Sequence, residues 1–150
     1  MFEKFQEILQ KLSSSIELPL KVDKLNACTL KIEDKIKIQL KIDKTENFLI
    51  MIAMVVELPP GKFKENVFIQ ALKANAEIEK VGYFAFSEKN SNLVLFEYVN
   101  RDISDKLLKA LFCQFTEKAI EWKEAINNNL SAPLSFLKET KIKPSPFDLK

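Results

Sequence analysis

The run FLIMIAMVVEL at residues 48–58 constrains the fold more than any other part of the sequence. Successive side chains of a strand point to opposite faces of its sheet, and this run is apolar at both parities. A strand of this composition needs cover on both faces. Its apolar part is far shorter than the ~20 residues that cross a bilayer, and Pro59, Pro60 and Gly61 end it abruptly. We therefore expect a central strand that is covered by helices on one face and by a second element, a second subunit or a client on the other.

Two further patterns predict hairpins. Residues 27–32 and 35–42 alternate between apolar and polar, which is typical of antiparallel strands with one wet face. Their apolar positions are Leu30, Ile32, Ile36, Ile38, Leu40 and Ile42. The intervening lysines either solvate the open face and protect a sheet edge, or form a charged rim for docking. Residues 81–87 and 93–99 predict a second hairpin, rich in aromatic and β-branched residues, with Phe84 and Phe86 on one face and Tyr83 on the other.

Three segments have helical periodicity. Near the N-terminus the apolar residues Phe2, Phe5, Leu9, Leu12 and Ile16 form one stripe, which either packs on the sheet or stays partly available to a partner. Residues 63–79 predict a second helix whose small residues Ala71 and Ala74 suit either a surface helix or a contact between subunits. A wide apolar stripe from Leu107 to Ile126 predicts the main core helix.

These elements predict an α+β domain with a twisted antiparallel sheet and the order α-β-β-β-α-β-β-α. Asn127, Asn128 and Asn129 end the last helix. The domain is expected to span residues 1–129. Residues 130–150 contain three prolines without a sustained period, which indicates a flexible tail with a short docked piece at 134–137.

Composition excludes many kinds of site. Without histidine there is no histidine-based triad or histidine metal ligand, and the two cysteines Cys28 and Cys113 make neither a four-thiolate zinc site nor a disulfide framework. With only two glycines, glycine-rich phosphate loops are impossible. Glu97, inside an apolar strand, is either a desolvated acid or, as is more common, a residue on the open face. We expect no enzyme activity, catalytic residue, cofactor or metal.

Charge and targeting features give no support for a nucleic-acid or membrane partner. Arg101 is the only arginine, and arginine is the residue that favours phosphate and base contacts. The net charge of +2 resides in the last 24 residues, which hold four lysines against two acidic residues. The charged, amphipathic N-terminus does not read as a secretory signal. We expect a cytoplasmic protein that binds no nucleic acid and inserts into no membrane.

The whole pattern resembles a known family. The leading helix FEKFQEILQKLSSSIELPL, the strand FLIMIAMVVELP breaking into KFKENVFIQALKANA, and the segment GYFAFSEKNSNLVLFEYVNRDISDKLLKALFCQFTEKAIEWKEAI resemble the class I type III secretion chaperones of the Tir-chaperone (CesT-like) family. The resemblance covers about residues 1–126, and within the family it looks closest to chaperones of the secretion gatekeeper protein. Most such chaperones are acidic, whereas this chain has a pI near 8.4.

The resemblance implies a small cytoplasmic homodimer without ATPase activity, which holds the N-terminal segment of a secreted effector or gatekeeper protein in extended form. A subset of the family forms heterodimers with a second chaperone. The dimer would be built by the second helix and second hairpin, through Phe68, Ala71, Leu72, Ile78, Phe84 and Phe86. The client would lie on the first helix and first hairpin, against Phe2, Phe5, Leu9, Leu30, Ile32, Ile36 and Ile38. The alternative is a small α+β module that encloses an apolar ligand or serves as an oligomeric enzyme subunit.

Overall fold

The computed structural model describes residues 3–16, 27–45, 47–78 and 80–137. The helices are α1 (Glu3–Ile16), α2 (Lys62–Asn75) and α3 (Asp105–Asn127). The strands are β1 (Ala27–Ile32), β2 (Ile36–Ile42), β3 (Phe48–Glu57), β4 (Tyr83–Ser87) and β5 (Asn92–Asn100). The predicted α+β class and the order α-β-β-β-α-β-β-α are confirmed.

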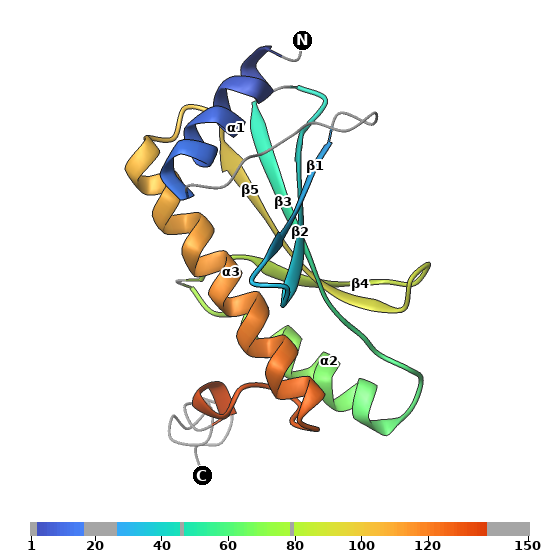
Figure 1. Cartoon of the computed structure of the whole chain (residues 1–150). Coiled ribbons are helices and arrows are strands. Elements are labelled where there is room, and N and C mark those ends of the chain that lie inside the picture. The colour runs from blue at the N-terminus through green and yellow to red at the C-terminus, as the bar shows by residue number, and fades with distance from the viewer. Residues whose placement is uncertain (1–2, 17–26, 46, 79, 138–150) are drawn as a thin grey trace.

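All five strands form one antiparallel sheet in the order β1-β2-β3-β5-β4. The long apolar strand β3 lies at the centre, as its composition predicts. A three-residue turn, residues 33–35, joins β1 to β2, and the Lys35 N–H donates to the Ile32 carbonyl at 2.8 Å. Glu33 and Asp34 both have positive φ, as in the tight hairpin turns that match strand twist. The second hairpin, β4–β5, continues the sheet beyond β3, so the sheet ends in β1 on one side and β4 on the other (Figure 1).

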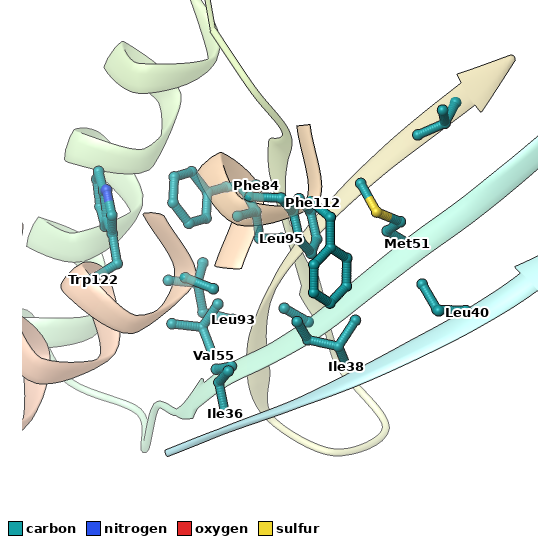
Figure 2. Packing of buried hydrophobic residues seen from close by; sticks show 14 of the residues in the cluster. Ile36, Ile38, Leu40, Met51, Val55, Phe84, Leu93, Leu95, Phe112 and Trp122 are labelled. Carbon is teal, nitrogen blue, oxygen red and sulfur yellow. The ribbon is translucent and has the colours of Figure 1, made fainter. Parts of the chain in front are cut away.

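The core lies between the sheet and the pair α1 and α3, which lie together on one face of it (Figure 1). One parity of each strand is buried there. From β2 and β3 these residues are Ile36, Ile38, Leu40, Leu49, Met51, Ala53 and Val55. Figure 2 shows Phe112 of α3 above the sheet near Ile38, and Trp122 of α3 on the Phe84 side of the core. The rings of Trp122 and Phe84 lie 4.4 Å apart.

Local chemistry sets the ends of the two later helices. α3 begins where the Ser104 hydroxyl accepts a hydrogen bond from the backbone N–H of Leu107, at 3.3 Å, as an N-cap should. α2 begins after Gly61 and ends at Asn75, earlier than the predicted residue 79. The shortening has a visible cause, because the Asn75 amide bonds to the backbone of Phe84 at the point where the chain turns into β4.

The chain packs on α3 beyond the asparagine stop. Ala132 is fully buried, residues 134–137 form one helical turn, and the Phe136 ring lies 5.5 Å from that of Trp122. The predicted docked piece is therefore present. The remainder of the predicted tail, residues 138–150, lies outside the described residues, and its flexibility stays a prediction. Among the helices described, none has the length and apolar character needed to span a membrane.

Candidate functional site

An apolar pocket of about 170 Å³ opens between α2 and β4. Its lining is Phe68, Ala71, Leu72, Asn75, Phe84, Ala85, Phe86 and Leu93. Five of the six residues predicted for a subunit interface therefore meet here. Leu72 remains 68% exposed at its rim. The sixth residue, Ile78, lies beyond the end of α2 and is 97% exposed.

Aromatic packing holds one wall of this pocket. The rings of Phe68 and Phe86 meet edge to face at 5.1 Å. The ammonium of Lys64 lies 4.2 Å from the centre of the Phe86 ring and 5.5 Å from that of Phe68. Cations over aromatic faces are attracted by the ring quadrupole. The pocket thus has an apolar floor and one cationic side.

Side chains from α2 and α3 fix β4 in place. The Asn75 amide donates to the Phe84 carbonyl at 3.0 Å and accepts from the Phe84 N–H at 2.7 Å, so it satisfies that residue as a neighbouring strand would. The Lys118 ammonium donates to the Val81 carbonyl at 2.9 Å. The Asn75 bonds occupy backbone groups of the terminal strand β4 that would otherwise be available to another chain, and the Lys118 bond holds the segment just before it.

Desolvation by burial lowers the pKa of the Lys118 ammonium below its usual range, although Glu77 and Glu97 act in the opposite direction. Glu97 lies on the helix-covered face, opposite Met51, and not on the open face that is more common for such a residue. Its carboxylate accepts a hydrogen bond from the Gly82 N–H at 2.7 Å. Glu97 therefore has a structural partner and does not resemble a free catalytic acid.

The residues predicted to hold a client divide into two groups. Phe5, Leu9, Ile36 and Ile38 are buried between the helices and the sheet, where they form core. Contact with a client would require α1 to separate from the sheet.

Leu30 and Ile32 of β1 are only partly buried and lie at the sheet's edge. Phe2 lies outside the described residues. Of the predicted set, the described surface therefore offers a client only these two β1 side chains.

Sequence reasoning predicted cover on the second face of the 48–58 strand but named no residues of that face as a site. Phe48, Tyr83 and Tyr98 are 38%, 44% and 53% exposed there. Neighbouring ring centres are 5.9 Å apart for Tyr83 and Phe96, 6.3 Å for Phe96 and Tyr98, and 6.1 Å for Tyr98 and Phe48. We call these four residues the aromatic stripe. The signal that could have located it was the second apolar parity of β3, which requires a covered face.

Polar constellations are sparse in the part of the chain that the structure describes. No group of three or more acidic, cysteine or histidine side chains is arranged there to hold a metal. A polar pocket between α1 and the start of α3 is lined by Glu7, Gln10, Lys11, Ser14 and Asp105, and Lys11 and Asp105 lie 3.7 Å apart. Exposed ion pairs of this kind contribute little to stability.

A sequence model of the Tir chaperone protein (CesT) family matches residues 7–123. The chain belongs to this family. The match spans α1 through most of α3 and so confirms the resemblance drawn from the sequence. Comparison with curated proteins by sequence finds no match.

Solved structures give the same fold for this CesT-family protein. A chain in the structure of the HopA1-SchA chaperone-effector complex aligns with a TM-score of 0.66 at 20% identity, covering 81% of this chain and 94% of that one. A chain in the structure of the Yersinia pestis type III secretion chaperone SycH in complex with a fragment of YscM2 aligns with a TM-score of 0.60 at 16% identity, covering 77% of this chain and 97% of that one. A chain in the structure of the ExoT-SpcS complex from Pseudomonas aeruginosa aligns with a TM-score of 0.60 at 14% identity, covering 79% of this chain and 97% of that one.

Proposed function

We propose that this CesT-family protein is a cytoplasmic type III secretion chaperone. It keeps the N-terminal segment of a secreted effector or gatekeeper protein soluble and in extended form, without ATP. The observation that carries the proposal is the family match over residues 7–123. It is supported by structural neighbours that include chaperone–effector complexes.

The pocket between α2 and β4 supports a homodimer. A second copy that covered the pocket would bury the rim residue Leu72, which is 68% exposed in the single chain. An obligate interface of this type buries about 2,000 Å² or more. The test is light scattering of the purified chain alone. A heterodimer with a second chaperone would instead leave the chain monomeric until its partner is added.

The edge of the sheet at β1 supports strand addition by the client. Asn75 and Lys118 already bond to the backbone next to or within β4, at the opposite edge. β1 is the other terminal strand, and its Leu30 and Ile32 are partly exposed. An added strand gains main-chain hydrogen bonds from the edge and specificity from alternate side chains.

The alternative of a small-molecule module has little structural support. The apolar pocket of about 170 Å³ is smaller than the roughly 300–1,000 Å³ typical of ligand sites.

The deciding experiment is co-purification of the tagged full-length chain from its native cell, with identification of any secreted protein that accompanies it. Leu30→Glu and Ile32→Glu should reduce client recovery. Because both residues also pack against the core, the circular dichroism melt should fall as well, and recovery is compared at a temperature at which both variants are folded. Leu107→Glu is the matched control, because Leu107 is an exposed leucine, 61% accessible, on α3 and not on the sheet. The proposal fails if no secretion substrate accompanies the wild-type chain.

A further inference from the structure

The open face of the sheet is divided into a cationic half and an apolar half. Cross-strand partners share a face, so the register identifies its rows. Three rows run from β1 across the sheet to β4 or β5: Lys31, Lys37, Met54, Val94 and Ala85; Thr29, Gln39, Ile52, Phe96 and Tyr83; and Ala27, Lys41, Ile50 and Tyr98. Each row is polar, small or cationic on β1 and β2, and apolar or aromatic from β3 onward.

The lysines of this face are not explained by the rest of the fold. Lys31 and Lys37 lie directly opposite each other, an arrangement that is unfavourable for like charges. Protection of a sheet edge accounts for Lys31, because β1 is a terminal strand, but Lys37 and Lys41 are on β2, which is paired on both sides. Within the described ranges, no carboxylate forms an ion pair with any of the three.

The adjacent aromatic stripe is also partly exposed to solvent. α1 and α3 lie on the opposite side of the sheet (Figure 1), and Tyr98 remains 53% exposed. Strands are about 4.8 Å apart, so the lysines of β2 lie roughly 10 Å from the stripe residues of β5. One helix, about 10 Å across, would cover both halves together.

We propose that this face binds an amphipathic helical segment of the client, with apolar side chains on the stripe and Asp or Glu along the flank above Lys37 and Lys41. The inference rests on the proposed function and adds the chemistry of the segment bound. A helix suits the site because the backbone groups of the inner strands are already paired within the sheet, and a helix satisfies its own. An extended chain lying on this apolar face would leave its backbone without partners.

The experiment uses the full-length chain and two fluorescent amphipathic peptides of about 18 residues, a length that can form a helix when bound. They share the same leucine and phenylalanine positions and differ only in carrying Glu or Lys on one flank. Wild type should bind the Glu peptide at least about tenfold more tightly at low ionic strength. The preference should shrink near 0.3 M salt, because exposed charges are screened over a few ångströms there.

Charge reversal at Lys37→Glu with Lys41→Glu should invert the preference between the peptides. Tyr98→Ser should weaken both peptides about equally. Lys109→Glu and Leu107→Ser on α3 are the matched controls, because both residues are exposed and lie on another element, and they should change neither affinity. Equal binding of the two peptides by wild type, or an acidic preference that survives the double reversal, would overturn the proposal. So would a loss of self-association in Tyr98→Ser with peptide binding intact, since a second copy would then be the cover of this face.

Client recovery separates this inference from the proposed function. If wild type and the double reversal recover the client equally, the open face is not its docking site and the chaperone assignment stands. If wild type recovers no secretion client, the chaperone assignment fails, and the peptide titration still decides the charge preference of the face.

Discussion

Leu72→Glu tests the proposed dimer with little risk to the fold. Leu72 is 68% exposed in the single chain, so the substitution removes few contacts within it. Burying a whole leucine side chain is worth about 1.5–3 kcal/mol, so burying the exposed two thirds at an interface is worth about 1–2 kcal/mol. A two-fold interface contains this residue twice, which doubles the loss to about 2–4 kcal/mol. Burial of two carboxylates adds a further penalty.

The resulting dissociation constant of the dimer should rise by about two orders of magnitude or more. Sedimentation velocity across a concentration series measures this constant directly. Leu107→Glu is the matched control, because Leu107 is 61% exposed on α3, away from the pocket. Leu107→Glu should keep the wild-type thermal melt, whereas Leu72→Glu should unfold cooperatively at a lower temperature, because association with a second copy stabilises the native state. A dimer constant that is unchanged in Leu72→Glu, or a wild-type chain that is monomeric at high micromolar concentration, would refute the reasoning.

Three further predictions concern stability. Gly82→Ala should lower the free energy of unfolding by more than the ~1 kcal/mol expected of Gly61→Ala. Gly82 has φ +81° and an added Cβ would lie 2.8 Å from the Leu95 side chain, whereas nothing lies within 4 Å of a Cβ added at Gly61. Equal urea midpoints of the two variants would contradict this. Truncation after residue 137 should leave the melt unchanged, whereas truncation after residue 129 should lower it by removing the buried Ala132; identical melts would show that this packing adds nothing. The pKa of Lys118 is lowered on folding, so the unfolded chain binds more protons than the folded chain as the pH approaches 10.5. The free energy of unfolding should therefore rise with pH in that range. A Lys118→Met variant whose free energy of unfolding rose equally with pH would assign the effect to another group.

The order of the elements was predictable because period and punctuation are local properties. The alternation at Ile36 and Ile38, the apolar run of β3 and the prolines after it each indicate an element without any tertiary information. The end of α2 was not predictable in this way. Residues 76–79 continue a plausible helix, but the bonds from Asn75 to Phe84 join residues nine apart, and their effect depends on where β4 lies.

The candidate site was predictable only in part, for a related reason. An apolar stripe such as that of Phe5 and Leu9 has the same sequence pattern whether it packs in the core or binds a client. The structure places both residues in the core. Five of the six residues predicted for the dimer do meet at one pocket, but their role in a dimer stays a prediction. The register between β5 and β3 determines which face of the sheet Glu97 and Tyr98 occupy. These strands are distant in sequence, so the sequence alone did not predict it.

Strand β3 has apolar side chains on both faces of the sheet, so it contributes both to the core and to the open face. Its one set of side chains needs the helices, and its other set has no described helix above it (Figure 1). If folding alone determined the residues on this face, Ile52 and Met54 could be polar, and the face would then need no cover. The neighbouring strand β2 already has polar residues there, at Gln39 and Lys41. Retaining apolar residues on β3 and β5 beside cations on β2 is unfavourable for an isolated sheet, since it leaves aromatic area in water and like charges opposed. The same arrangement is favourable once an acidic amphipathic partner lies across it, so the composition of this face is better explained by binding than by folding.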